Sequence, residues 1–228
     1  MLFDDQDFAV FKNEGERLIF VEITNLYYLK NFRSAIASLY ALVIFDLYNK
    51  LNDMDELGNK NSKTFLKRIQ SDIKQNKHFS DIEKDIIEFY KNSFSTYFNK
   101  FFNDIDYLTE LRHKCAHLYL NDNGLYIPTQ NQTKMLIESM YNNLFKVEAP
   151  FIDDLFTIAQ NDIEYYSDKI YLYLDDSKGI RNKLSKKYFD KMMDISISKT
   201  IKTLFKLLFI TNNDDSNKYL DGIFILID

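Results

Sequence analysis

Residues 94–118 read FSTYFNKFFNDIDYLTELRHKCAHL, and this stretch decides the fold. Its apolar side chains recur at intervals of three or four residues, which is the spacing of one face of an α-helix. The spacing predicts one long helix whose apolar face packs in a core. The members of this stripe are Phe94, Phe98, Phe101, Ile105, Leu108, Leu111, Cys115 and Leu118.

The composition of the whole chain also favours helices. Of the 228 residues 46% are hydrophobic, yet there are only five glycines and two prolines. So few turn-forming residues argue against a β-rich fold, which needs many turns. A chain of this length can bury one good core. We therefore expect an all-α protein, an antiparallel helical bundle whose helices are joined by short polar loops.

Apolar residues at helical spacing also predict helices on both sides of residues 94–118. Leu18 is among the residues expected on the apolar face of the first of them. Asn61 and Ser62 are candidate N-cap residues, and Ser80 with Glu83 has the pattern of a capping box. The expected helices cover about residues 14–30, 35–51, 65–73, 82–90, 130–146, 150–173 and 189–208.

A polar run at residues 175–179 is the candidate domain boundary. Residues 1–175 are expected to form the helical bundle. Residues 176–228 are expected to form a C-terminal helical extension packed on the same core.

Charge and cysteine usage narrow the functional classes. The formal net charge of −5 disfavours a protein that grips long nucleic acids through phosphate contacts alone, but it permits a small basic pocket for one RNA loop or end. Cys115 is the only cysteine, which excludes a disulfide within one chain and fits a reducing compartment. The first seven residues carry acidic groups where a signal peptide needs basic ones. The most apolar run, residues 39–45, is too short to span a bilayer. We expect a cytoplasmic protein with no membrane segment.

Polar residues suited to acid–base chemistry gather at the end of the apolar stripe. Two of the three histidines, His113 and His117, lie within five residues of Arg112. At about 100° per residue, Arg112 lies roughly 80° from the stripe and both histidines lie nearly opposite it. The core does not require these side chains, so we expect them to face a ligand or a partner.

An imidazole and a guanidinium together suit cleavage of RNA by its own 2′-hydroxyl group. Histidine transfers protons near neutral pH, which makes His117 the candidate general acid or base. Arginine offers a fixed fork of donors to a phosphate whose charge is increasing, which makes Arg112 the candidate stabiliser of the transition state. The nucleophile belongs to the substrate, so no metal or other cofactor is expected. Single-stranded RNA or an RNA loop is the expected substrate, because its unstacked bases are accessible.

A single pair of Arg112 and His117 provides few groups for an active site. Arg112 and His117 are five residues apart and do not stack on one helix face. A two-fold dimer would bring two pairs together across an isologous interface, so we expect a homodimer.

The pattern Arg112-x4-His117, ending in Lys-Cys-Ala-His, resembles the Arg-x4–6-His signature of the HEPN superfamily. Residues 31–36 and 46–51 also resemble the first core helix of HEPN proteins from abortive-infection systems. The resemblance covers about residues 15–165. It implies a dimeric, metal-independent endoribonuclease that leaves 2′,3′-cyclic phosphate ends and acts in phage defence or as a toxin. It assigns catalysis to Arg112 and His117.

Neighbouring residues complete the resemblance. His113 occupies the position after the arginine, where the family more often has asparagine, and His113, Lys114 and Glu110 are candidate supporting residues. Tyr119 extends the match to Arg-x4-His-x-Tyr. This version is similar to HEPN toxins whose nucleotidyltransferase antitoxin adenylylates the tyrosine, so Tyr119 is a candidate modification site and such an antitoxin a candidate partner.

Other interpretations of the same residues stay open. The chain would equally suit a catalytically inactive HEPN module for binding or dimerisation, since a fold does not fix a function. Arg112 would then form only a surface ion pair, with Asp104, Asp106 or Glu110 as its partner. His117 would be an ordinary histidine at a helix end.

Two further residue groups have ordinary structural interpretations. His113 and His117 are four residues apart and could hold zinc, but no third ligand stands at motif spacing. Cys115 belongs to the apolar stripe, which predicts a buried, unreactive thiol. A basic face on the last helix is either only solvated or guides RNA; it consists of Lys183, Lys186, Lys187 and Lys191.

Overall fold

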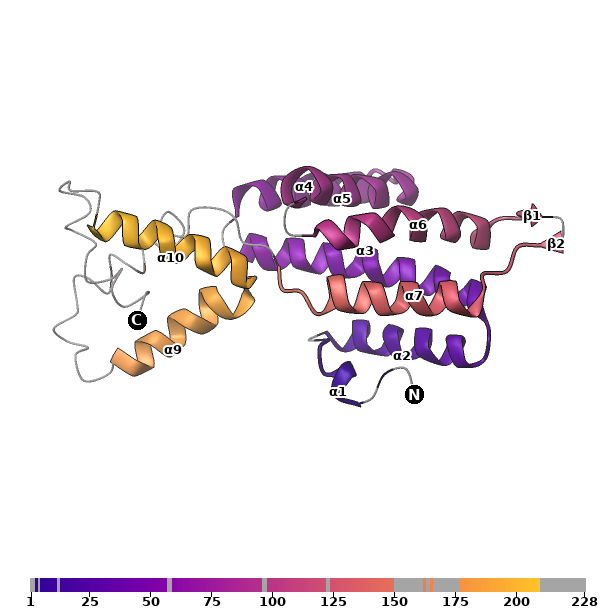
Figure 1. Cartoon of the computed structure of the whole chain (residues 1–228). Coiled ribbons are helices and arrows are strands. Elements are labelled where there is room, and N and C mark those ends of the chain that lie inside the picture. The colour runs from indigo at the N-terminus through magenta and orange to yellow at the C-terminus, as the bar shows by residue number, and fades with distance from the viewer. Residues whose placement is uncertain are drawn as a thin grey trace. The chain divides into compact units, whose positions relative to one another are not determined.

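The computed structural model describes most of the chain. The described residues are 3, 5–11, 13–56, 59–95, 98–121, 124–149, 162, 165 and 177–209. Their regular secondary structure is helical apart from one small hairpin, so the all-α prediction is confirmed (Figure 1). The helix expected over residues 150–173 lies outside the described residues, except for positions 162 and 165.

The elements follow one another along the chain with short connections. The first five helices are α1 (Asp5–Phe8), α2 (Glu14–Tyr28), α3 (Phe32–Glu56), α4 (Lys60–Lys74) and α5 (Phe79–Phe94). Then come α6 (Asn99–Ala116), β1 (Leu120–Asn121), β2 (Gly124–Leu125), α7 (Gln130–Met140) and the π-helical turn η1 (Tyr141–Phe145). The last described elements are α9 (Ser177–Tyr188), the 3-10 turn η3 (Phe189–Lys191) and α10 (Asp194–Phe209).

The chain divides into two compact units. Unit 1 consists of residues 1–49 and 69–147, and it contains α2, α5, α6 and α7 with most of α3. Unit 2 consists of residues 50–68 and 148–228, and it contains α9 and α10. The division predicted at residue 175 lies outside the described residues.

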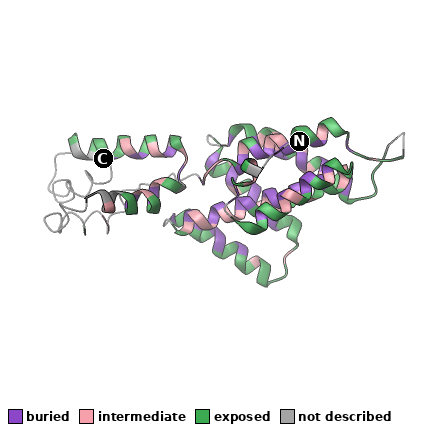
Figure 2. Ribbon diagram, turned by 90° about the horizontal axis from the view of Figure 1, so that it is seen from below, coloured by how far each residue is buried: buried purple, intermediate pink, exposed green. Residues whose placement is uncertain are grey.

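Aromatic rings fill the core of unit 1. The ring of Phe20 in α2 meets Phe3 edge-on with centroids 5.0 Å apart and stacks near Tyr141 of η1 at 5.6 Å. Tyr90 of α5 is fully buried, and its hydroxyl donates to the carbonyl of Leu47 in α3 over 2.9 Å. Burial of one such side chain contributes about 1.5–3 kcal/mol. Figure 2 shows the buried residues on the inward faces of these helices.

The helix predicted from Phe94 to Leu118 is shorter at both ends. Phe94 is the last residue of α5, and after a break α6 runs from Asn99 to Ala116. The apolar spacing continues across the break because both Phe94 and Phe98 pack on the ring of Tyr90, at 5.3 and 5.7 Å. The stripe is buried from Phe98 to Cys115, but Leu118 lies beyond α6 and is 80% exposed.

Other details of the predicted helices are corrected as well. Leu18 is exposed, because α2 packs on the core through Phe20, Ile23 and Tyr27 instead. α4 begins at Lys60, and the side chain of Asn59, rather than Asn61 or Ser62, accepts the cap hydrogen bond, from the amide of Ser62 at 2.9 Å.

The capping box predicted at Ser80 and Glu83 is absent. α5 begins earlier, at Phe79, and its N-cap residue His78 makes no side-chain cap hydrogen bond. The carboxylate of Glu83 has a tertiary partner instead, described below.

The last predicted helix is divided by η3. α10 begins at Asp194, while Lys183, Lys186 and Lys187 lie on α9 and Lys191 ends η3. Lys187 pairs with Asp162, so one member of the predicted basic face is neutralised within the chain. None of the described helices is long and apolar enough to cross a membrane.

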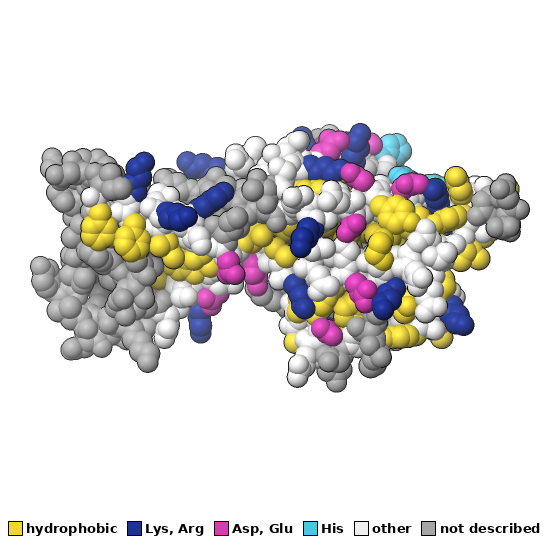
Figure 3. All heavy atoms as spheres, in the orientation of Figure 1, with side chains coloured by type: hydrophobic (Ala, Val, Ile, Leu, Met, Phe, Trp, Pro, Cys, Tyr) yellow, Lys and Arg dark blue, Asp and Glu magenta, His cyan; other side chains and the backbone are white. Residues whose placement is uncertain are grey.

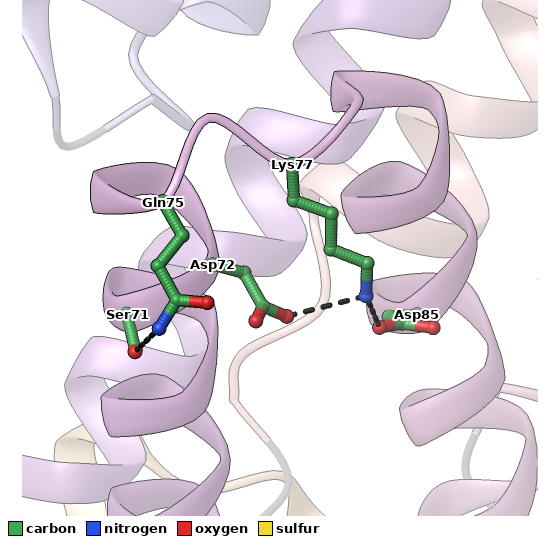
Figure 4. A network of polar contacts seen from close by, with 5 residues as sticks. All are labelled: Ser71, Asp72, Gln75, Lys77 and Asp85. Carbon is green, nitrogen blue, oxygen red and sulfur yellow. Dashed lines mark hydrogen bonds and ion pairs between the residues drawn. The ribbon is translucent and has the colours of Figure 1, made fainter.

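Two helices of unit 1 end in the same way. Lys30 (φ 60°) and Asn76 (φ 54°) adopt the left-handed conformation just after α2 and α4. The following amides, of Asn31 and Lys77, donate to carbonyls one turn back over 2.8 and 3.0 Å, as in a Schellman motif. At the second turn the ammonium of Lys77 also bridges Asp72 (3.3 Å) and Asp85 (3.0 Å), which ties α4 to α5 (Figure 4).

A hairpin connects α6 to α7. Leu120 of β1 pairs with Leu125 of β2, and Gly124 has φ of 101°, a conformation that side-chain-bearing residues rarely adopt. α7 then begins with a complete capping box between Thr129 and Gln132. The two helices therefore run back along each other (Figure 1).

Candidate functional site

The predicted site residues lie in the last turns of α6 and just beyond it. Leu111 and Cys115 are buried, Arg112 is half-buried and His113 is exposed. His117 is the C-cap residue, with φ of −111° and ψ of 167°, so it stands in extended backbone rather than within a helix as predicted. The predicted exposure of both histidines is confirmed.

The two histidines lie side by side. Their rings are nearly parallel, with an interplanar angle of 13° and centroids 6.3 Å apart. Both side chains are exposed, so two imidazoles are presented together to solvent.

The side chain of Arg112 contacts two other helices of unit 1. Its Nη2 lies 3.3 Å from Oε2 of Glu83 in α5, and the guanidinium carbon lies 5.0 Å from the ring centroid of Tyr40 in α3. Burial, the charge of Glu83 and a hydrogen bond to its carboxylate raise the pKa of Tyr40 to about 12, although the charge of Arg112 opposes this shift. One side chain from each of three helices thus forms a half-buried polar contact.

The ion pair expected as an alternative for Arg112 exists, but with a different partner. The three acids predicted for it are engaged elsewhere: Asp104 accepts a hydrogen bond from Ser139, Asp106 pairs with Lys91, and Glu110 pairs with Lys114.

The candidate supporting residues Lys114 and Glu110 contact each other and the hairpin. The Nζ of Lys114 pairs with Glu110 and lies 5.3 and 5.5 Å from the ring centroids of Tyr119 and Tyr126. The hydrogen bond to Glu110 raises the pKa of Lys114. Tyr119 itself is exposed, as a modified residue must be.

The structure brings the two histidines together but not Arg112 and His117. Among the described residues, no hydrogen bond, ion pair or ring contact joins these two side chains. In the same part of the chain, no group of three histidine, cysteine or acidic side chains is placed to hold a metal ion. Cys115 is buried as predicted, and burial raises the pKa of its thiol while the charge of Arg33 opposes the shift.

Arg33 is the residue that sequence reasoning missed. It lies in the first turn of α3, and its guanidinium donates to carbonyl oxygens at the end of α6 and in the segment that returns from the hairpin. Contacts between a side chain and backbone more than 80 residues away leave no periodic trace in a sequence. The one signal in the sequence that could have drawn attention to Arg33 was its place in residues 31–36, the segment that resembles the first core helix of HEPN proteins.

Exposed apolar side chains lie at the same end of unit 1 as the histidines. They belong to the hairpin and the segments that flank it: Leu118, Leu120, Leu125 and Ile127. Figure 3 shows histidine and hydrophobic side chains next to one another at this end of unit 1.

No protein-family model, curated protein or solved structure matches this chain.

The arrangement offers three kinds of chemistry at one end of unit 1. The paired imidazoles can serve as proton acceptors and donors. The guanidinium of Arg112 and the ammonium of Lys114 are two of the cations at this end, and each pairs with one carboxylate. The exposed apolar side chains can exclude water when another surface covers them.

Proposed function

We propose that the protein is a metal-independent endoribonuclease of the HEPN type that cleaves single-stranded or loop RNA, in phage defence or as a toxin. The observation that carries this proposal is the pair of parallel, exposed imidazoles at the end of α6, the helix that also carries the half-buried guanidinium of Arg112. Acid–base groups open to solvent at the end of a rigid helix suit a reaction whose nucleophile is supplied by the substrate.

The reaction needs one proton removed and one proton delivered. The 2′-hydroxyl loses its proton to a base, its oxygen attacks the phosphorus, and the bond from phosphorus to the 5′-oxygen breaks. The 5′-oxygen then takes up a proton, which leaves a 2′,3′-cyclic phosphate and a 5′-hydroxyl. His117 would act as general acid or base, with His113 as the supporting proton carrier beside it.

Arg112 would stabilise the charge on the phosphate in the transition state. Glu83 is its only hydrogen-bond partner among the described residues, so other N–H donors of its guanidinium remain for phosphate oxygens. A phosphate that binds there competes with the carboxylate of Glu83. The ion pair would therefore hold the guanidinium in place between encounters with RNA.

A homodimer belongs to the same proposal. One histidine pair provides few catalytic groups around a scissile phosphate. An isologous interface would add the same arginine and histidines from the second protomer. The exposed side chains Leu118 and Leu120 are the apolar surface we assign to it. Light scattering on the eluting protein should give the mass of a dimer, and Leu118→Glu with Leu120→Glu should give a monomer; a monomeric wild type would contradict this part.

The nuclease proposal is tested with purified protein, total RNA and EDTA. Cleavage is expected to persist in EDTA and to fall by about 100-fold or more in His117→Ala and Arg112→Ala. His78→Ala is the matched histidine control and Arg17→Ala the matched arginine control, because both residues are exposed and lie outside the site. End-group analysis should find cyclic phosphates. RNA that stays intact at all protein concentrations would contradict the proposal.

The second candidate is a catalytically inactive HEPN module for binding or dimerisation. The pairing of Arg112 with Glu83 favours it, because the guanidinium is already neutralised and does not contact His117. A stable dimer that leaves RNA intact would support this candidate.

A nucleotidyltransferase antitoxin would be compatible with the exposed position of Tyr119. Mass spectrometry of the protein co-expressed with a nucleotidyltransferase should then find adenylyl groups on Tyr119 but not on Tyr119→Phe. Unmodified Tyr119 would leave no role for such a partner.

A further inference from the structure

The C-terminal end of α6 differs from the ends of α2 and α4. The last carbonyl groups of a helix have no partner within it and need other donors. After α2 and α4 the backbone itself supplies them, through the left-handed residues Lys30 and Asn76. After α6 the chain leaves directly in an extended conformation at His117, without a left-handed residue.

At this helix end Arg33 supplies donors from a side chain. Its Nη2 donates to the carbonyls of Cys115 and, over 3.3 Å, of His117. Its Nη1 donates to the carbonyl of Tyr126 over 2.7 Å and lies 3.5 Å from that of Lys114. One planar group therefore joins the last turn of α6, the histidine cap and the segment that returns from the hairpin.

The chemistry of these contacts suits arginine in particular. The guanidinium is a rigid fork that donates in several directions at once, whereas the ammonium of lysine is a single point of charge. Its positive charge also lies at the negative end of the α6 dipole, which is favourable. The side chain is half-buried, so water competes less for the same carbonyls.

We propose that Arg33 is a positioning residue that holds His117 and the hairpin in the arrangement the site requires. Its catalytic consequence rests on the proposed nuclease function, but the positioning is a property of the protein alone. Loss of Arg33 leaves the carbonyls of Cys115, His117 and Tyr126 without this donor. His117 and the hairpin then move together relative to α6, while the apolar face of α6 stays packed.

The test compares Arg33→Ala and Arg33→Lys with the wild type. Arg17→Ala and Arg17→Lys are the matched controls, because Arg17 makes an exposed ion pair with Glu14 in α2. Hydrogen exchange is measured at the amides of His117, Tyr119 and Tyr126, which bond to the carbonyls of His113, His117 and Tyr119. Circular dichroism and exchange in α5 report whether the core has folded.

We expect exchange at these three amides to rise about 10-fold or more in both Arg33 variants, with α5 and both controls unchanged. Where RNA is cleaved, kcat should fall about 10- to 100-fold while KM changes little, because a displaced acid–base group affects the chemical step. Added methylguanidinium should partly restore slow exchange in Arg33→Ala.

Unchanged exchange in a folded Arg33→Ala, or full restoration by Arg33→Lys, would overturn the inference. Wild-type kcat in both variants would overturn its catalytic part and leave the nuclease proposal standing. The exchange measurement needs no RNA, so it decides the positioning role even if the wild type proves to be inactive on RNA.

Discussion

The surroundings of Arg112 and of His117 differ sharply although five residues separate them. Arg112 lies against Tyr40 and pairs with Glu83, with three-quarters of its side chain withdrawn from solvent (24% exposed). His117 lies beyond the last turn, beside His113, and is followed by an exposed leucine. α6 thus holds the guanidinium of Arg112 in place within its last turns, while the imidazoles of His113 and His117 at its end are exposed to solvent.

This contrast bears on how a nuclease site would work. A guanidinium that is prepositioned by Glu83 loses little freedom when a phosphate binds, which favours catalysis by orientation. The disadvantage is that a phosphate must compete with the carboxylate of Glu83 for the guanidinium of Arg112. Within the described part of the chain no carboxylate pairs with either histidine, so their arrangement depends on the α6 terminus and the hairpin.

The largest expected effect is a difference in stability between alanine variants of two leucines in the predicted stripe. Leu111 is 1% exposed and Leu118 is 80% exposed. Leu111→Ala should lower the free energy of unfolding by about 2–5 kcal/mol at every protein concentration, because it leaves a cavity. Leu118→Ala should change the free energy of unfolding of the monomer by less than about 0.5 kcal/mol. Urea denaturation at protein concentrations low enough to keep the chain monomeric measures both. Equal losses in the monomer would mean that Leu118 is buried within unit 1 and would break the comparison.

The next effect is a loss of stability at alkaline pH, caused by Tyr40, the tyrosine that contacts Arg112. The pKa of Tyr40 is raised from 10.0 to about 12, so between these values the unfolded chain has released this proton and the folded protein has kept it. The unfolded state then binds fewer protons, and stability falls as pH rises from about 10 to 12, by about 2 kcal/mol, while it is unaffected by this group below pH 10.

Tyr40→Phe should remove this contribution to the fall in the free energy of unfolding. Denaturant titrations at several pH values between 9 and 12 measure that free energy. Tyr119→Phe, which removes an exposed hydroxyl, is the control and should keep the full slope. A remaining slope is expected from Tyr188, whose pKa burial and a hydrogen bond to Asp162 also raise to about 12. Identical slopes in both variants would show that Tyr40 is accessible to water.

Periodicity predicted the features that depend on local geometry. The apolar residues expected in α3, such as Leu39 and Leu47, are all buried, and the histidines opposite the stripe of α6 are exposed. Such features follow from residue spacing because a helix repeats every few residues.

Features that depend on tertiary partners were missed for a physical reason. Ser80 and Glu83 match a capping box locally, but the carboxylate gains a charged partner, Arg112, 29 residues away. The break between α5 and α6 keeps the apolar spacing because both ends pack on Tyr90. The hydrogen bonds of Arg33 depend on which helix ends meet, and no spacing of residue types encodes that.

A smaller effect is expected from the ion pair on the Arg112 side. Glu83→Gln should cost about 1 kcal/mol of stability, because both side chains of its pair are less than one-quarter exposed. Glu110→Gln should cost less, because the carboxylate that pairs with Lys114 is 57% exposed and water screens the pair. A double-mutant cycle with Arg112→Gln isolates the coupling between the two side chains. A coupling near zero would mean that Arg112 is already as open as His117.

The smallest effect on global stability is expected at the hairpin, on the His117 side. Gly124 has φ of 101° and open space where a Cβ would stand, so Gly124→Ala meets backbone strain but no clash. The strain is about 1 kcal/mol and falls on a segment outside the helical core, so the main unfolding transition should hardly move while exchange at the Tyr126 amide accelerates. Gly15→Ala is the control: any effect there belongs to the first turn of α2, where a Cβ would lie 3.0 Å from Oδ1 of Asn13. If Gly124→Ala also weakened the coupling between Glu83 and Arg112, the two surroundings would form one cooperative unit and the histidine end could not open by itself. If that coupling is unchanged, the hairpin can rearrange while the guanidinium of Arg112 stays in place.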